Sequence, residues 1–341
     1  MVWLPRLYQV GMTNILAGDI GGTSARFGLF AFEPTGLRPL AKATYRCREF
    51  DGLEKIVARF RHEYPGEFGV ATIGVAGPVI DGHVVTPNLP WTVSSTAVAK
   101  AAGLDTLELI NDLVANAYGT AALSPADLAV IQPGTPDPTG HACIISAGTG
   151  LGQAGFFFDG KARRPMPSEG GHADFAPQNE QEIELLRFLQ ARFGHVSYER
   201  VLSGPGLVNI YEFLTATGRG EEGHDLTAHL TASPAGAAGH ISRAGMVGTS
   251  TRAVLALDQF VSIYGAAAGN LALNFKSTGG VYIGGGIAPQ LLSRLQDGRF
   301  LHAFLDKGRL RSLLEQMSIQ VILNDECALL GAAVHAAQSL R

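Results

Sequence analysis

Short apolar runs alternate with amphipathic segments along this chain, and the alternation predicts a mixed α/β fold. The first two runs, Ile15–Gly18 and Ala25–Phe32, are separated by so few residues that they predict two strands joined in a hairpin. Other apolar runs predict strands at Gly69–Val75, Leu107–Ile110 and Gly279–Ile283. Apolar positions at helical spacing predict helices at Gly52–His62, Leu113–Leu123, Glu180–Phe193 and Ala288–Leu295.

The strand, glycine turn, strand pattern occurs a second time, at Ala142–Ser146 and Gln153–Phe158. This repeat of pattern predicts two related halves that face a common ligand. The segment Phe260–Ser293 carries one charge, at Lys276, but its periodicity changes midway. It therefore predicts a buried helix followed by a buried strand, not a membrane span. Thr217–Thr251, rich in small and polar residues, leaves both a weak helix and a mobile loop open.

Composition narrows the class of protein. The 341 residues suffice for two domains, and 46% hydrophobic residues exclude a disordered chain. The formal net charge of −4 offers no basic excess for binding nucleic acid. Cys47, Cys143 and Cys327 form neither a CxxC pair nor an even set, which favours a reduced cytoplasmic setting. Residues 1–11 lack the pattern of a secretory signal.

Three clusters of glycine follow predicted strands, at Asp19–Thr23, Gly148–Gly152 and Gly284–Gly286. Backbone N–H groups in a tight turn form a concavity that attracts phosphate oxygens, and glycine lets the chain approach such a ligand closely. Two clusters contain threonine, whose hydroxyl donates to phosphate, and the Asp19 carboxylate suits a hydrated Mg²⁺ ion. One cluster alone is better explained as an ordinary turn, whereas three together favour a phosphate site.

Two common phosphate-binding motifs are excluded. The chain has no GxxxxGK[ST] sequence, so it is not a P-loop protein. Gly150–Gly155 fits GxGxxG, but it runs into Phe156–Gly160, which predicts a strand and a turn. A dinucleotide-binding turn would open a helix at this point. A nicotinamide cofactor is therefore not expected.

Polar residues gather in other predicted turns. Asn111 and Asp112 follow a predicted buried strand, at the edge where open α/β sheets bind ligands. Asp112 is equally compatible with merely capping the helix that follows. Glu169, His172 and Glu199 lie in turn-like segments and suit sugar hydroxyls, which both donate and accept hydrogen bonds. A metal site is the other use of such a group, but their spacing does not match a zinc motif.

Six separated segments agree, in order and spacing, with one family: Leu16–Phe30, Leu107–Ala117, Ile145–Gly155, Pro167–Pro177, His195–Tyr211 and Gly279–Pro289. In them the chain closely resembles the bacterial glucokinases of the hexokinase and actin-like ATPase superfamily. The resemblance runs from about Asn14 to about Gly331. The cysteine-rich zinc motif of a related sugar-kinase group is absent, so the chain resembles the zinc-free branch.

The resemblance implies a two-lobed, ribonuclease H-like α/β fold with the active-site cleft between the lobes. A small lobe would comprise residues 1–112, completed by a helix at 326–341, and a large lobe residues 113–325. The implied activity is ATP-dependent phosphorylation of the glucose 6-hydroxyl, with Mg²⁺, in a cytoplasmic homodimer that needs neither nucleic acid nor membrane. A broader hexose kinase, a sugar-sensing regulator and an actin-like ATPase are the alternatives.

The resemblance also implies roles for single residues. Asp112 matches the family's catalytic aspartate. The residues that match glucose ligands are Asn111, Asp112, Glu169, His172 and Glu199, together with Asn88 in a segment that departs from the family pattern at Leu89 and Pro90. The residues that match the ATP-binding turns are Asp19, Gly21, Gly22, Thr23, Gly148, Thr149, Gly150, Gly284, Gly285 and Gly286. Asp19 would hold Mg²⁺ through water.

Overall fold

The computed structural model of the chain describes residues 13–34, 36–85, 89, 91–223, 226–227, 230 and 236–340. It divides into two compact units. The first takes in the chain up to Leu123 together with the segment from Glu326 onward, and the second is Ser124–Asp325.

The first unit contains two sheets and four α-helices among its described residues. The strands are β1 (Asn14–Ile20), β2 (Ser24–Glu33), β3 (Gly36–Arg46), β4 (Val70–Val75), β5 (Val79–Ile80), β6 (His83–Val84), β7 (Val93–Ser94) and β8 (Glu108–Asn111). The helices are α1 (Leu53–Glu63), α2 (Ser95–Ala102), α3 (Asp112–Gly119) and α13 (Cys327–Gln338). The main sheet has the order β3-β2-β1-β4-β8, and β5, β6 and β7 form a small second sheet. β2 runs antiparallel to β1 and β3, whereas β4 and β8 run parallel to β1.

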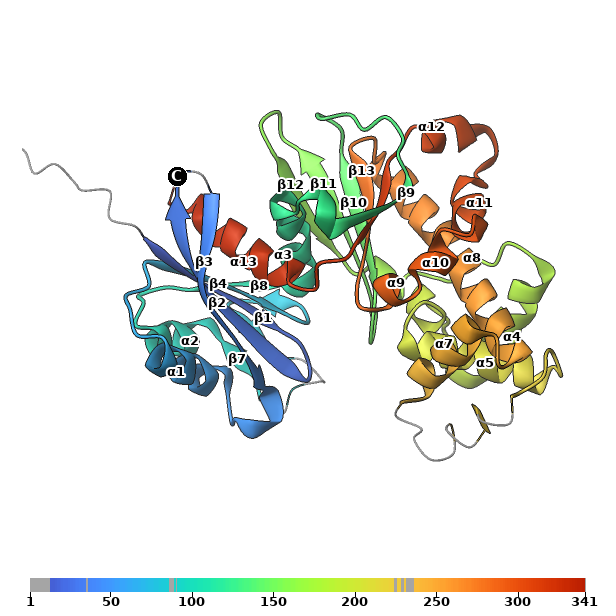
Figure 1. The fold of residues 1–341 in the computed structure, drawn as a ribbon, viewed down its shortest axis with the longest axis horizontal. Coiled ribbons are helices and arrows are strands. Elements are labelled where there is room, and N and C mark those ends of the chain that lie inside the picture. The colour runs from blue at the N-terminus through green and yellow to red at the C-terminus, as the bar shows by residue number, and fades with distance from the viewer. Residues whose placement is uncertain are drawn as a thin grey trace, which may run out of the picture. The chain divides into compact units, whose positions relative to one another are not determined.

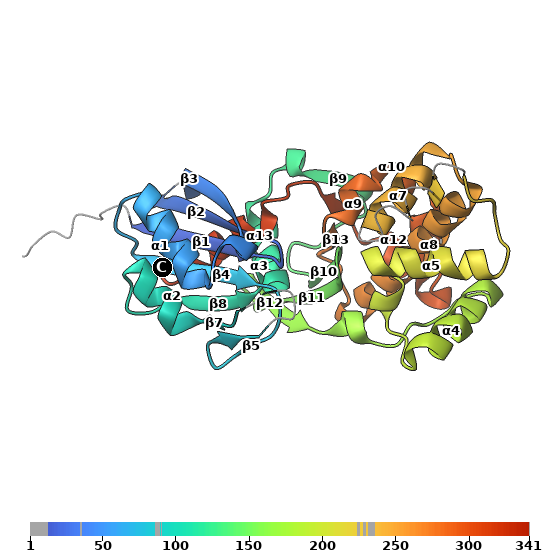
Figure 2. The same cartoon turned by 90° about the horizontal axis from the view of Figure 1, so that it is seen from below.

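Both faces of the main sheet are covered at its centre, which explains why β1, β2 and β4 are mostly apolar and buried. Leu16 and Ile20 of β1 join one hydrophobic cluster with α1 and α2, which pack side by side (Figure 2). Ile15 and Ala17 face the opposite way and pack against α13, the red helix next to α3 in Figure 1. Gly331 allows this approach, because a Cβ there would lie 1.7 Å from the carbonyl oxygen of Ala115 in α3.

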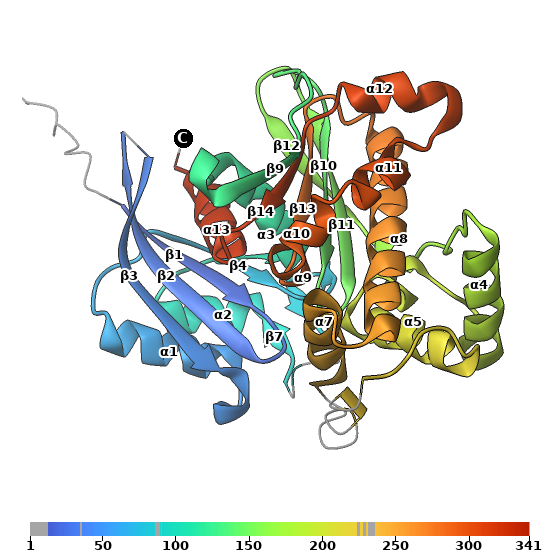
Figure 3. The same ribbon diagram turned by 45° about the vertical axis from the view of Figure 1, so that its right-hand side comes forward.

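The second unit is built on a six-stranded sheet with the order β12-β11-β10-β13-β14-β9. Its strands are β9 (Leu128–Gln132), β10 (Ala142–Ala147), β11 (Leu151–Phe158), β12 (Arg163–Ser168), β13 (Gly280–Gly284) and β14 (Ile319–Ile322). Its helices are α4 (Glu180–Phe193), α5 (Gly204–Ala216), α7 (Ala237–Val247), α8 (Thr251–Phe275), α9 (Ile287–Gln290), α10 (Leu292–Leu295), α11 (Arg299–Leu305) and α12 (Arg311–Glu315). The long helix α8 packs with α5, α7 and α11 (Figure 3).

The two main sheets repeat one topology. In each, a meander of three antiparallel strands is followed by two strands parallel to the first, as β1-β2-β3 with β4 and β8 in one unit and β10-β11-β12 with β13 and β14 in the other. The predicted duplication is therefore confirmed at the level of topology. The interpretation of Phe260–Ser293 as a helix followed by a strand is also confirmed by α8 and β13.

Several predicted boundaries were wrong. The helix predicted at Ala288–Leu295 is two short helices, α9 and α10, because Leu291 between them leaves helical geometry, with φ −102° and ψ 15°. The helix predicted at Leu113–Leu123 ends at Gly119 and continues as a 3-10 turn, Thr120–Ala122. Strand β12 was missed because Pro165 and Pro167 argue against a strand, and they are tolerated here because β12 is an edge strand.

Two segments on which predictions were made lie wholly or partly outside the described residues. Residues 1–11 and Asn88 are not described. Of the segment Thr217–Thr251, the structure describes α7 as a helix, so helix is the correct alternative for that stretch. Among the residues that the structure describes, no helix combines the length and the apolar character that crossing a bilayer requires.

Candidate active site

The first glycine turn, Gly21–Thr23, joins β1 to β2 at the carboxyl end of the central strand of its sheet. The N–H of Gly21 donates to the carbonyl oxygen of Ser24 at 3.0 Å and closes the turn. Gly22 and Thr23 are exposed. Asp19, half-buried, lies two residues before the turn. The turn therefore presents backbone groups and a carboxylate at one edge of the sheet.

Asn111 and Asp112 lie at that same edge, because β8 runs parallel to β1 with only β4 between them. Gly74 of β4 makes the close approach possible. A Cβ on Gly74 would lie 2.9 Å from the Cβ of Ala115, 3.6 Å from the carbonyl oxygen of Gly18 and 3.8 Å from the Cα of Asp112. The start of α3 is thus held against the end of β1.

Asn111, not Asp112, is the N-cap of α3. The Asn111 Oδ1 accepts hydrogen bonds from the N–H groups of Leu113 at 2.8 Å and Val114 at 3.4 Å, and its Nδ2 donates to the Gly77 carbonyl at 3.2 Å. Asp112 is the first residue of the helix, and its Oδ1 accepts from the Leu113 N–H at 2.9 Å. The interpretation of Asp112 as the cap is therefore wrong, because its neighbour performs that role.

The second glycine turn, Gly148–Gly150, joins β10 to β11. The N–H of Gly148 donates to the carbonyl oxygen of Gly150 at 2.9 Å, and the Gly148 carbonyl accepts from the N–H of Gly204 at 2.8 Å. Gly204 is the first residue of α5, whose N-cap is Ser203. The turn is thus docked on the N-terminus of a 13-residue helix. The dipole of that helix end favours an anion nearby.

Glu199 reaches the second turn from the 3-10 turn Tyr198–Arg200. Its Oε2 accepts from the N–H of Leu151 at 2.9 Å. It also lies only 2.6 Å from the position that a Cβ on Gly150 would take. The residue predicted to bind the sugar and the turn predicted to bind phosphate are therefore in direct contact in this unit.

Glu169 and His172 lie in a second short turn beside Leu151. Glu169 precedes the 3-10 turn Gly170–His172, and both side chains are exposed. This turn packs on β11, since a Cβ on Gly171 would lie 1.9 Å from the Leu151 carbonyl oxygen. Backbone hydrogen bonds then join its continuation to the Glu199 segment, from Phe175 N–H to Val196 at 2.9 Å and from Tyr198 N–H to Ala173 at 2.9 Å. The turns that carry the three predicted sugar ligands are therefore held together around Leu151.

The third turn, Gly284–Gly286, follows β13 and contacts the end of β10. Gly285 has φ +81°, and a Cβ there would lie 2.2 Å from the carbonyl oxygen of Ala147. Only glycine meets both demands. Tyr264 of α8, fully buried, ties the two strand ends together. Its hydroxyl lies 3.3 Å from the carbonyls of Ile145 and Gly284 and accepts from the Ala147 N–H at 3.3 Å. Burial raises the pKa of Tyr264, so it stays neutral.

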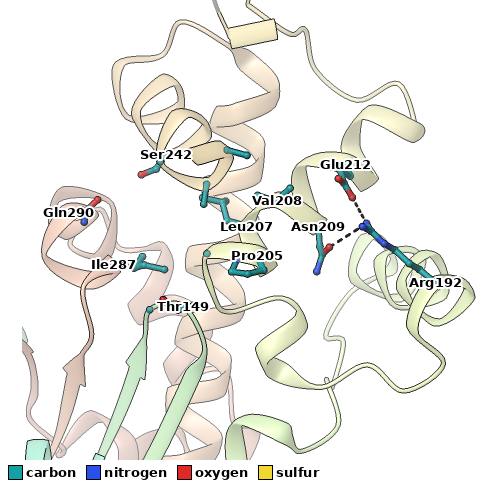
Figure 4. A pocket seen from close by; sticks show the side chains of 15 residues that line it. Thr149, Arg192, Pro205, Leu207, Val208, Asn209, Glu212, Ser242, Ile287 and Gln290 are labelled. Carbon is teal, nitrogen blue, oxygen red and sulfur yellow. Dashed lines mark hydrogen bonds and ion pairs between the residues drawn. The ribbon is translucent and has the colours of Figure 1, made fainter. Parts of the chain in front are cut away.

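A pocket of about 570 Å³ lies beside the second and third turns (Figure 4). Gly148 and Thr149 line one part of it, and Ile287 and Gln290, just after the third turn, line another. The other lining residues are Arg192, Gly204, Pro205, Leu207, Val208, Asn209, Glu212, Ala237, Ala238, Gly239 and Ser242. The volume and the mainly apolar lining with a few polar groups are typical of a small-molecule site.

Most of this lining was missed by sequence reasoning. The start of α5 could have been found, because Ser203 followed by Pro205 is the signature of a capped helix N-terminus. Nothing local marks Arg192, which pairs with Glu212 and donates to Asn209 Oδ1 at 3.5 Å. Its place at the pocket follows from the packing of α4 on α5 alone.

Two sheets that repeat this topology, each with a glycine turn between its first two strands, are typical of the hexokinase and actin-like fold. The family model for glucokinase matches residues 16–339. A glucokinase from Synechocystis sp. is 39% identical over 356 aligned positions, covering 96% of this chain and 98% of that protein. The crystal structure of a glucokinase from an Antarctic psychrotroph is 31% identical, covers 95% of this chain and 99% of that chain, and has a TM-score of 0.83. The crystal structure of a glucokinase from Balamuthia mandrillaris in complex with glucose shares the fold at 20% identity and a TM-score of 0.76. The match covers 97% of this chain and 95% of that chain.

The chain belongs to the glucokinase family, and its activity is the ATP-dependent phosphorylation of glucose. The predictions of fold class and reaction are thereby confirmed.

Proposed function

We propose that Asp112 is the catalytic base. It would accept the proton of the glucose 6-hydroxyl as that oxygen bonds to the γ-phosphorus of ATP and the bond to the bridging oxygen of ADP breaks. The observation that carries this role is the position of Asp112, which begins α3 at the carboxyl end of β8, the same end of the sheet as the glycine turn Gly21–Thr23. A carboxylate is a weak base, so the proton moves late, after bond formation has acidified the hydroxyl.

Asn111, Asp112, Glu169, His172 and Glu199, with Asn88, are proposed to bind glucose. Carboxylate, amide and imidazole groups pair with hydroxyls as donors and acceptors. A sugar in which one hydroxyl is missing or inverted leaves such a group without its hydrogen bond, and this penalty discriminates strongly between glucose and that sugar. Fructose and galactose should therefore be poor substrates.

The glycines of the second and third turns support an ATP site beside the pocket. At Gly150, Gly284 and Gly285 the packing of the protein disfavours a side chain, because a Cβ on each would lie 2.6 Å or less from an atom of another residue. Gly148 and Gly286 differ, because a Cβ on either would meet no protein atom within 4 Å. We infer that at these two positions glycine leaves room for the nucleotide.

Gly148→Ala is expected to raise the KM for ATP by about tenfold or more with little loss of stability. The added methyl group would occupy the space assigned to phosphate without contacting protein. Gly66→Ala is the matched control, because a Cβ there also meets nothing within 4 Å and Gly66 lies outside the three turns. Steady-state kinetics and thermal melting of both variants measure the effect, and an unchanged KM for ATP in Gly148→Ala would remove this assignment.

Asp19 fits a Mg²⁺ ion that arrives with ATP. Mg²⁺ in such enzymes is held by one or two carboxylates, water and substrate phosphates, not by a cage of protein ligands. A carboxylate two residues before a turn proposed to bind phosphate matches this pattern, and within the described ranges no three His, Cys, Asp or Glu residues gather into a metal cage. The ion would neutralise charge on the transferred phosphoryl group.

ADP formation is expected to depend on the sugar. Water competes with glucose as acceptor, and binding energy from the sugar would be needed to complete the site. A coupled assay of ADP release, run over a panel of sugars and phosphoryl donors, tests this. Rapid ADP release without sugar would indicate an ATPase. No ADP release with any sugar would indicate a non-catalytic regulator. Equal rates with several hexoses would indicate a kinase of broader specificity.

A homodimer and a cytoplasmic location follow from the family resemblance alone and stay predictions.

A further inference from the structure

A short 3-10 turn, Cys47–Glu49, follows β3 and lies against the first glycine turn. The N–H of Cys47 donates to the Thr23 carbonyl at 3.0 Å, and its thiol donates to the Gly21 carbonyl at 3.5 Å. Cys47 is 1% exposed. One residue thus binds two of the three carbonyl groups of the glycine turn.

These two bonds also determine where the amides of the turn point. The peptide bond is planar and trans, so the C=O of one residue and the N–H of the next point in opposite directions. Directing the Gly21 carbonyl at Cys47 therefore turns the Gly22 N–H away from Cys47, and the bond to Thr23 does the same for the Ser24 N–H. Gly22 itself is exposed.

The Cys47 turn is itself anchored. The N–H of Phe50 donates to the Cys47 carbonyl at 3.2 Å, and the indole Nε1 of Trp91 donates to the Phe50 carbonyl at 3.0 Å. The chain of hydrogen bonds from Trp91 to the glycine turn stays within one unit of the protein. Burial raises the pKa of the Cys47 thiol, so it remains the protonated donor that the bond to Gly21 requires.

We propose that Cys47, backed by Phe50 and Trp91, is a positioning residue that orients the amides of the first glycine turn toward the ATP phosphates. This rests on the proposed ATP-binding role of that turn. Cys47 itself touches no substrate. Its loss would let the peptide planes of the turn rotate, which weakens phosphate binding without changing the groups that bind glucose.

The comparison of Cys47→Ala with Cys47→Ser tests the proposal. Alanine removes the donor, and we expect the KM for ATP to rise by about threefold to tenfold while the KM for glucose stays within about twofold. Serine keeps a donor and should restore the KM for ATP. If Cys47 only fills space, the order reverses, because a buried hydroxyl in apolar surroundings is worse than a methyl group. Equal KM values for ATP in all three proteins would also overturn the proposal.

Cys327→Ala is the matched control. Cys327 is equally buried, and its thiol donates to a backbone carbonyl, that of Asn116 at 3.4 Å, but it joins α13 to α3. The substitution Cys327→Ala should lower the melting temperature without raising the KM for ATP. A rise equal to that of Cys47→Ala would show that lost stability, not the position of the turn, is being measured.

Should Cys47→Ala fail to fold, Trp91→Phe serves in its place. Phenylalanine keeps an aromatic ring and removes the donor to Phe50, so the KM for ATP should rise by at least about twofold. An unchanged value would overturn the proposed anchor. Wild-type enzyme without sugar-dependent ADP release would instead refute the proposed function, so the two failures are distinguishable.

Discussion

Replacing Asp112 with asparagine is expected to lower kcat by about 10²–10⁴-fold while glucose still binds. Asparagine keeps the Oδ1 atom that accepts from the Leu113 N–H, so the start of α3 is preserved. The negative charge and the ability to accept the hydroxyl proton are lost. Rapid kinetics give kcat, and calorimetric titration gives the dissociation constant of glucose.

Asp105→Asn provides the control for the removed charge. Asp105 is exposed and lies in the loop before β8, so the same substitution there should leave kcat unchanged. Near-normal turnover in Asp112→Asn would mean that the carboxylate serves only the helix end, as its hydrogen bond to Leu113 already does.

Replacing Gly150 with alanine is expected to lower kcat/KM for glucose by about tenfold to a hundredfold. The new Cβ would lie 2.6 Å from the Glu199 Oε2, so the carboxylate must move and abandon its bond to the Leu151 N–H. We expect a larger effect on glucose than on ATP, the reverse of the pattern expected for Gly148→Ala two residues earlier.

A double-mutant cycle isolates this contact. In a Glu199→Ala background there is no carboxylate to displace, so Gly150→Ala should add little further loss. If Gly150→Ala lowers kcat/KM for glucose by the same factor with and without the Glu199 carboxylate, the added methyl group does not act through Glu199.

The glycine turns illustrate how far the sequence alone reaches. Each strand, turn, strand unit is local, so apolar periodicity and turn glycines located β1 with β2 and β10 with β11. The rejection of a dinucleotide motif at Gly150–Gly155 was also correct, because the chain continues there as the strand β11 and not as a helix.

Boundaries were harder to predict. The cap of α3 is Asn111, and both Asn111 and Asp112 are residue types that cap helices well, so local preference could not choose between them. The choice depends on the register in which β8 pairs with β4, where Asn111 lies opposite Val75 as the last residue of the ladder.

The sequence by itself therefore determined the α/β class, the duplication and the three glycine turns, because these follow from residue type and short spacing. Only the tertiary structure decided which distant residues meet. Glu199 reaches Leu151, the start of α5 reaches Gly148, and Cys47 reaches Gly21. Such contacts depend on strand order and on helix packing, which no short stretch of the chain encodes.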